Sequence, residues 1–94
     1  MGQEMIYSLL YHPKIEDDIK KIDNKIKEII KRAIEQRLII DPVKYGSPLR
    51  RGLKGYRKMR VGDYRVIYCI IDDEIRIVVI GHRRDVYLKA NKRK

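Results

Sequence analysis

The spacing of apolar residues changes once along this 94-residue chain, and that change limits the folds open to it. Between residues 13 and 39, apolar side chains recur every three or four positions, which is the period of a helix with one buried face. Between residues 57 and 80, apolar and polar side chains alternate, as in half-buried strands. The sequence therefore predicts an α+β fold, in which a helical segment packs on one face of an antiparallel sheet.

Turn and cap residues divide these two regions into elements. Pro13 suits the first turn of a helix, and Asp23 or Asn24 can cap a second one, which makes the helical region a hairpin. Gly62-Asp63 and Asp72-Asp73 are typical of tight turns between strands, so the last three strands form a meander. The predicted elements are a strand over 5–11, helices over 13–22 and 24–39, and strands over 57–61, 64–71 and 74–80.

The length of the chain suits one domain, which we expect to span residues 1–94. A basic tail over about 88–94 is expected to be flexible, and the region after Gly81 to hold at most one short helical turn. Residues 1–11 lack the pattern of a signal peptide, and no segment has the length of a transmembrane helix. For these reasons no membrane partner is expected. Cys69 is the single cysteine, so no disulfide can form within the chain, which predicts a protein of the reducing cytoplasm.

The net charge of +10 is concentrated in two blocks. Residues 1–43 carry eight basic and eight acidic side chains, whereas residues 44–65 carry eight basic side chains against Asp63 alone. Residues 81–94 carry six basic side chains against Asp85. Charge gathered in this way attracts polyanions. Nucleic acid is favoured over a membrane surface, because the sequence lacks an amphipathic helix with Trp, Phe or Leu opposite Lys and Arg.

Strand alternation predicts which side chains share a face of the sheet. If Gly62-Asp63 is a two-residue turn, Arg60 lies opposite Arg65, and Val61 lies opposite Tyr64. The predicted core face carries Met59, Val61, Tyr64, Val66, Tyr68, Ile70, Ile75, Ile77 and Val79. The predicted uncovered face carries Lys58, Arg60, Arg65, Ile67, Cys69, Arg76, Val78, Ile80 and His82. Like charges on neighbouring strands repel, so an anion is expected on the uncovered face.

Several chemistries find no support in the sequence. The chain has two histidines, and the acidic residues 72–74 are typical of a turn, so neither a metal nor any other cofactor is expected. No glycine-rich phosphate loop or serine nucleophile elbow is present, and Cys69 is interpreted as a buried thiol.

Cleavage of RNA through its own 2′-hydroxyl requires no metal. It requires a base, positive charge around the phosphate and a proton for the departing 5′-oxygen. Arginine and lysine can stabilise the charge, and a lysine among arginines loses its proton more readily, so it can act as a base. Tyrosine can stack on an unpaired nucleobase or donate a proton.

Two segments carry a resemblance to a known family. The run Leu-Lys-Gly-Tyr-Arg-Lys-Met-Arg-Val-Gly-Asp-Tyr-Arg-Val-Ile-Tyr at 53–68, and the run Ile-Gly-His-Arg-Arg-Asp-Val-Tyr at 80–87, are similar to motifs of the RelE/ParE toxin superfamily. The order of predicted elements agrees over essentially the whole chain. The resemblance implies a toxin of a toxin–antitoxin pair, wrapped by a RelB-like antitoxin. RelE-type members cleave mRNA in the ribosomal A site and contact ribosomal RNA, whereas ParE-type members inhibit DNA gyrase.

The resemblance to RelE-type members also implies roles for individual residues. Arg65 would stabilise the phosphate, Lys58 would be the base or a charge stabiliser, and Arg83 would assist the leaving oxygen. Tyr87 would stack on an mRNA base. His82, Arg83 and Arg84 are three candidates for the single C-terminal role, and Lys54 is an alternative to Lys58. The cations implied to hold ribosomal RNA or the mRNA backbone are Lys54, Arg57, Arg60 and Arg84.

Three functions follow from this reading. The favoured one is a ribosome-dependent, metal-independent endoribonuclease. The alternatives are a gyrase inhibitor without nuclease activity and a general RNA-binding domain. The presence of Arg65, Arg83 and Tyr87 together favours the ribonuclease, because a binding inhibitor does not need all three.

Overall fold

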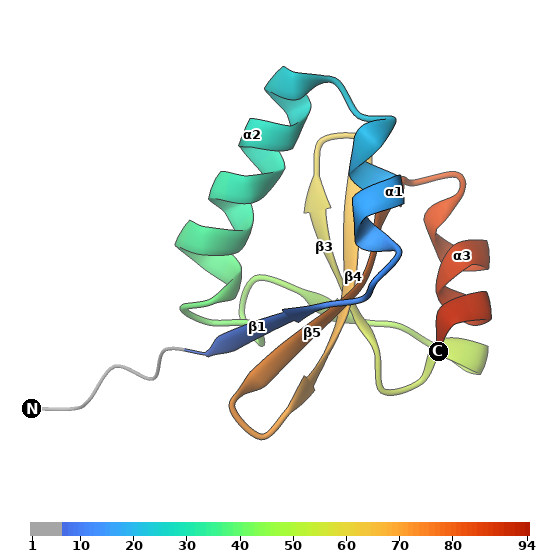
Figure 1. Ribbon diagram of the computed structural model, residues 1–94. Coiled ribbons are helices and arrows are strands. Elements are labelled where there is room, and N and C mark those ends of the chain that lie inside the picture. The colour runs from blue at the N-terminus through green and yellow to red at the C-terminus, as the bar shows by residue number, and fades with distance from the viewer. Residues whose placement is uncertain (1–6) are drawn as a thin grey trace, which may run out of the picture.

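The computed structural model describes residues 7–94, in which a five-stranded sheet has helices on both faces (Figure 1). The strand order is β1-β5-β4-β3-β2, with β1 parallel to β5 and the other neighbours antiparallel. The strands are β1 (Ser8–Tyr11), β2 (Ser47–Pro48), β3 (Arg57–Val61), β4 (Tyr64–Ile71) and β5 (Glu74–His82). The helices are α1 (Ile15–Lys20), α2 (Asn24–Ala33), the π-helical turn η1 (Ile34–Leu38), the 3₁₀ turn η2 (Arg51–Leu53) and α3 (Val86–Arg93).

The predicted α+β class, helical hairpin and antiparallel meander are confirmed. Gly62 has a φ of +61°, which suits a tight turn, and the strands beside it pair in the predicted register. Arg60 lies opposite Arg65, and Val61 lies opposite Tyr64. The first strand is shorter than predicted and begins at Ser8, and residues 5 and 6 of the prediction lie outside the described part of the chain.

One face of the sheet packs against α1, α2 and η1, as the helical spacing of apolar residues between 13 and 39 predicts (Figure 1). Tyr68 is fully buried at this interface, and its hydroxyl donates a hydrogen bond to the carbonyl of Pro42 at 2.5 Å. The buried members of this first core are Ile15, Ile22, Ile30, Ala33, Ile34, Leu38, Met59, Val61, Val66, Tyr68, Ile75, Ile77 and Ile80.

A β-bulge in β5 makes part of the predicted face assignment wrong. Ile67 pairs with Val79 and Tyr68 pairs with Ile77, so Val78 is the extra residue. One inserted residue reverses the side-chain alternation of the strand beyond it. Val79 therefore packs in a second core beneath α3, and Ile80 packs in the first core.

The other face of the sheet is not uncovered, and the predicted flexible tail is wrong. Residues 86–93 form α3, whose side chains Val86 and Ala90 are fully buried against the sheet. These two residues are one helical turn apart, which gives α3 a narrow apolar stripe among lysines and arginines. The second core consists of Leu53, Ile67, Val78, Val79, Val86 and Ala90. Within residues 7–94, no helix is long and apolar enough to cross a bilayer.

Candidate nucleic-acid interface and active site

Lys58 of β3 and Tyr87 of α3 come together where α3 covers the sheet. The Lys58 ammonium nitrogen lies 5.9 Å from the centre of the Tyr87 ring. Tyr87 is partly buried against the second core, because it lies in the first turn of α3 beside the buried Val86. Docking of α3 thus creates a cation–aromatic pair between two sequence-predicted site residues.

Arg65 lies on the same face of the sheet as Lys58, because the register places Lys58 beside Ile67 and Arg60 beside Arg65. The Arg65 side chain is buried, and its Nη1 donates to the carbonyls of Gly62 and Tyr64 at 2.9 and 2.8 Å. These contacts hold the guanidinium against the β3–β4 turn. A buried, anchored guanidinium costs little further entropy when it binds a phosphate.

Gly81 of β5 lies opposite Arg65 on the other side of β4. A Cβ atom built at Gly81 would meet no heavy atom within 4 Å, so the sheet has open space at Gly81 itself. The sequence did not identify this feature, because the position of Gly81 relative to Arg65 depends on the bulge at Val78.

Arg83 is tied to the same turn from the end of β5. Its main-chain N–H donates to the Asp63 carbonyl at 2.9 Å, and its Nε lies 3.9 Å from the Asp63 carboxylate. The Asp63 side chain is 71% exposed, so this ion pair is weak and leaves the arginine available to another anion. Arg65 and Arg83 therefore flank one turn.

His82 departs from the predicted face. It pairs with Tyr64 in the sheet, and the two ring centres lie 5.7 Å apart in an edge-to-face arrangement. The predicted place of His82 beside Lys58, Arg60 and Arg65 is wrong, because the bulge at Val78 turns its side chain toward the first core. His82 Nδ1 also accepts a hydrogen bond from the main-chain N–H of Arg84 at 3.2 Å.

Arg57 lies on the other face of the sheet from Lys58, where it stabilises a loop. Its Nη2 donates to the carbonyls of Val43 and Gly46, each at 3.0 Å. Lys54 is exposed in the loop after η2, and Arg84 is exposed beyond the end of β5. Of the two candidate lysines, Lys58 is the one with a contact to Tyr87.

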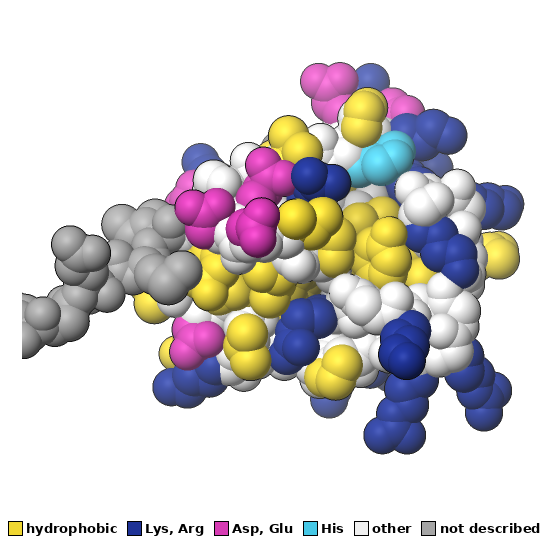
Figure 2. Space-filling model, turned by 90° about the horizontal axis from the view of Figure 1, so that it is seen from below, with side chains coloured by type: hydrophobic (Ala, Val, Ile, Leu, Met, Phe, Trp, Pro, Cys, Tyr) yellow, Lys and Arg dark blue, Asp and Glu magenta, His cyan; other side chains and the backbone are white. Residues whose placement is uncertain are grey.

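Lysine and arginine side chains gather on the α3 and η2 side of the molecule, at the right of Figure 2.

Cys69 lies farther along β4, and burial raises the pKa of its thiol, although the nearby Arg76 acts in the opposite direction. A raised pKa makes this thiol a poor nucleophile at neutral pH. Within residues 7–94, no three His, Cys, Asp or Glu side chains are grouped as metal ligands.

Sequence comparisons identify related proteins along most of the chain. The family model described as "ParE toxin of type II toxin-antitoxin system, parDE" matches residues 9–87. Toxin RelG of Mycobacterium tuberculosis is 31% identical over 85 residues, which are 88% of this chain and 98% of RelG. Toxin RelE of the same organism is 35% identical over 63 residues, which are 67% of this chain and 65% of that toxin.

Solved structures share the fold. A chain in the RelBE2 toxin–antitoxin complex of M. tuberculosis superimposes with a TM-score of 0.77 at 29% identity, over 83% of this chain and 99% of that one. A mutant of the Escherichia coli toxin RelE in the free state superimposes with a TM-score of 0.75 at 23% identity, over 95% of this chain and 98% of that one. The present chain thus belongs to the RelE/ParE superfamily and is a RelE-family toxin of a type II toxin–antitoxin system.

Proposed function

We propose that this toxin is a metal-independent endoribonuclease that cleaves mRNA in the ribosomal A site. The observation that carries the proposal is the arrangement of Lys58, Arg65 and Tyr87 on one face of the sheet, with Arg83 at the adjoining turn. The family names of the related proteins include both ParE and RelE, so the choice between inhibitor and nuclease depends on the chemistry of this site.

The proposed reaction is an internal transfer at the scissile phosphate. A base removes the proton of the 2′-hydroxyl, and the 2′-oxygen attacks phosphorus as the bond from phosphorus to the 5′-oxygen breaks. A proton reaches the departing 5′-oxygen, so the products are a 2′,3′-cyclic phosphate and a 5′-hydroxyl. Negative charge builds on the phosphate oxygens in the transition state, where fixed cations have their largest effect.

Each residue is assigned the role that its position permits. Arg65, buried and anchored at the β3–β4 turn, stabilises the phosphate. Lys58 is the base or a second charge stabiliser, and Tyr87 stacks on an mRNA base next to it. Arg83 assists the leaving oxygen from the turn. The exposed Arg60, opposite Arg65, holds the RNA backbone together with Lys54 and Arg84.

The proposed partners are a RelB-like antitoxin, the ribosome and mRNA. Similar solved structures include complexes of a toxin with its antitoxin from M. tuberculosis, Staphylococcus aureus and Methanococcus jannaschii. The strongly basic surface suits ribosomal RNA, which presents a dense array of phosphates. The proposed location is the cytoplasm, where translating ribosomes are found.

The test is primer extension on a translated mRNA, with and without ribosomes. We expect cuts in phase with codons only when ribosomes are present. Intact mRNA together with arrested DNA gyrase would identify a gyrase inhibitor and overturn the proposal. RNA binding without cleavage or codon phase would identify a general RNA-binding domain instead.

A further inference from the structure

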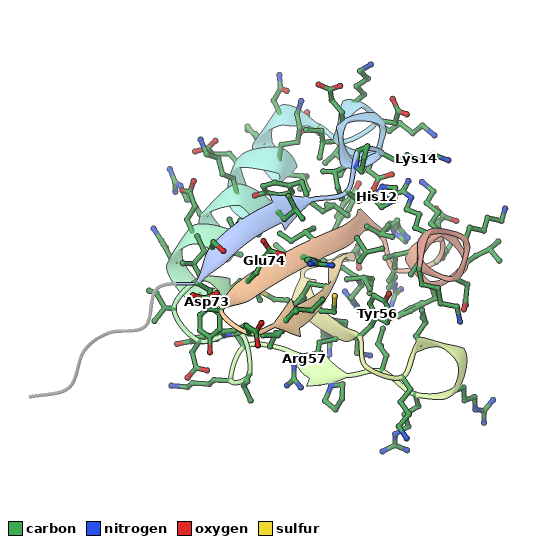
Figure 3. The ribbon with its side chains drawn as sticks, turned by 60° about the horizontal axis from the view of Figure 1, so that its bottom comes forward. His12, Lys14, Tyr56, Arg57, Asp73 and Glu74 are labelled. Carbon is green, nitrogen blue, oxygen red and sulfur yellow. The ribbon has the colours of Figure 1, made fainter. Side chains whose placement is uncertain are left out.

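The outer edge of β5 changes its partner halfway along the strand. In the described part of the chain, β1 pairs with β5 from Glu74 to Ile77, and the last contact is the His12 N–H donating to the Ile77 carbonyl at 2.9 Å. The chain then turns away from β5 at His12 and enters α1 (Figure 3). Beyond this point, the Val78 carbonyl and the Ile80 N–H need other partners, because unpaired buried main-chain groups are costly.

Asp18 of α1 and Arg93 of α3 are those partners. Asp18 Oδ2 accepts from the Ile80 N–H at 3.2 Å, and Arg93 Nη1 donates to the Val78 carbonyl at 3.0 Å. The two side chains also bind each other through two hydrogen bonds, Nη1 to Oδ2 at 2.7 Å and Nη2 to Oδ1 at 2.8 Å. We call this arrangement the Asp18–Arg93 clasp. It joins elements from the two ends of the described chain around the edge of the sheet (Figure 1).

The clasp is buried and has the geometry of a strong ion pair. The side chains of Asp18 and Arg93 are 2% and 10% exposed, and both Asp18 oxygens are used. Two parallel bonds between a guanidinium and a carboxylate fix orientation as well as distance. Lys89 of α3 lies 3.8 Å from Asp18 Oδ1, so without Arg93 the buried carboxylate would keep only this looser ion pair and the Ile80 N–H. Without the Asp18 charge, the buried guanidinium would keep only the Val78 carbonyl, and loss of a buried partner is more costly than loss of a surface pair.

Helix α3 depends on such contacts for its position. With eight residues it is too short to be stable alone, so its docked state comes from packing. Val86 and Ala90 hold one stripe of α3 on the sheet, and Arg93 holds its last turn. Tyr87 lies in the first turn of the same short helix, so a shift of the last turn at Arg93 tilts the helix and moves the tyrosine ring.

We propose that Asp18 is a positioning residue of the active site, which holds α3 through Arg93 and thereby keeps Tyr87 over Lys58. The geometric part of this proposal concerns the folded chain alone. The effect on cleavage rests on the proposed function.

The first test measures the Lys58–Tyr87 contact by NMR. The ring current of Tyr87 shifts the resonances of the Lys58 ε-methylene protons, and Tyr87→Ala defines the value without the ring. In Asp18→Asn we expect most of this shift to be lost. Asp17→Asn is the matched control, because Asp17 is on the same helix, 74% exposed, and pairs only loosely with Lys20 at 3.9 Å. A folded Asp18→Asn protein with the wild-type shift would overturn the proposal.

A milder variant guards against loss of folding. Arg93→Lys keeps the positive charge but cannot form two parallel hydrogen bonds with the carboxylate. We therefore expect a partial loss of the ring-current shift. We also expect amide exchange in α3 to be faster than in the wild type, while exchange in β4 stays unchanged. Wild-type values for both measurements would also overturn the proposal.

The second test is a double-mutant cycle on cleavage of ribosome-bound mRNA. If Asp18 acts through Tyr87, adding Asp18→Asn to Tyr87→Ala causes no further fold-loss in rate. Independent, multiplying losses would overturn the positioning role. If the wild-type toxin cleaves no mRNA, the proposed function fails, and the NMR measurement still decides whether the clasp holds Tyr87 over Lys58.

Discussion

Arg65 of β4 lies directly opposite Gly81 of β5, and the absent side chain at Gly81 leaves open space on the face of the sheet that carries Arg65. The hydrogen bonds from Arg65 to the Gly62 and Tyr64 carbonyls hold the buried guanidinium at the adjoining β3–β4 turn. We expect a phosphate that enters over Gly81 to reach the arginine held at this turn. The pair of residues therefore defines the place where we expect the scissile phosphate to bind.

Filling this space should impair cleavage without affecting folding. Gly81→Val introduces a β-branched side chain in a strand, where no neighbouring atom lies within 4 Å of the new Cβ. We expect a thermal midpoint close to that of the wild type and a cleavage rate lower by about 100-fold, the scale associated with a misplacement of about 1 Å. Primer extension and thermal unfolding provide the two measurements. Ile71→Thr, at the exposed far end of β4, is the control, and full cleavage by Gly81→Val would refute the assigned phosphate position.

Arg65→Lys should reduce cleavage while keeping the positive charge. Lysine cannot reproduce a guanidinium that binds two carbonyls and a phosphate together. We expect the cleavage rate to fall by about 10-fold or more, because a hydrogen bond to a charged group contributes about 1.5–3 kcal/mol. Single-turnover rates on ribosome-bound mRNA check this expectation. A rate equal to that of the wild type would show that charge alone is sufficient at this position.

Replacement of Tyr87 distinguishes stacking from proton donation. If the ring stacks on a nucleobase, Tyr87→Phe retains most of the cleavage rate and Tyr87→Ala loses about 1–3 kcal/mol of stacking, or roughly 5- to 150-fold. The same rate assay compares the two variants. Equal losses in both would assign the role to the hydroxyl group.

Arg57 and Arg60 lie on opposite faces of β3, and we expect opposite effects from their replacement. Arg57→Ala removes two hydrogen bonds to the loop carbonyls of Val43 and Gly46, so the free energy of unfolding should fall by about 1–3 kcal/mol while cleavage by folded protein is unchanged. Arg60→Ala, at an exposed position, should leave stability unchanged and weaken binding to RNA. Urea titration and salt-dependent RNA binding measure the two effects. Weaker RNA binding with unchanged stability in Arg57→Ala would show that Arg57 contacts RNA.

Cys69 should react slowly with alkylating reagents. Burial raises the pKa of its thiol, so the reactive thiolate is a smaller fraction near pH 7.5 than in an unfolded chain. The folded protein should therefore be alkylated more slowly than the same protein in denaturant, and the difference should shrink as the pH rises above the raised pKa. Mass spectrometry of iodoacetamide adducts over time measures both rates. Equal rates at pH 7.5 would contradict the expected protonation of this thiol.

Local patterns predicted much of the fold and part of the candidate site. The Gly62-Asp63 turn and strand alternation predicted the pairing of Arg60 with Arg65, because both depend only on near neighbours in the chain. The same reasoning placed His82 and Val79 on the wrong faces of the sheet. A bulge depends on how two strands pair, so the pattern of one strand alone does not predict it. Arg57 and Arg65 are equally basic in sequence, and only their contacts distinguish a loop anchor from a candidate phosphate site.

By itself, the sequence determined the period of each element, the order of the elements along the chain and the concentration of positive charge after residue 43. The tertiary structure decided that residues 86–93 dock as α3, that Tyr87 reaches Lys58, and that Asp18 meets Arg93. The physical reason is that an eight-residue helix with a narrow apolar stripe has little stability of its own. Its position is determined by groups from distant parts of the chain, which become neighbours only when the sheet and the clasp have formed.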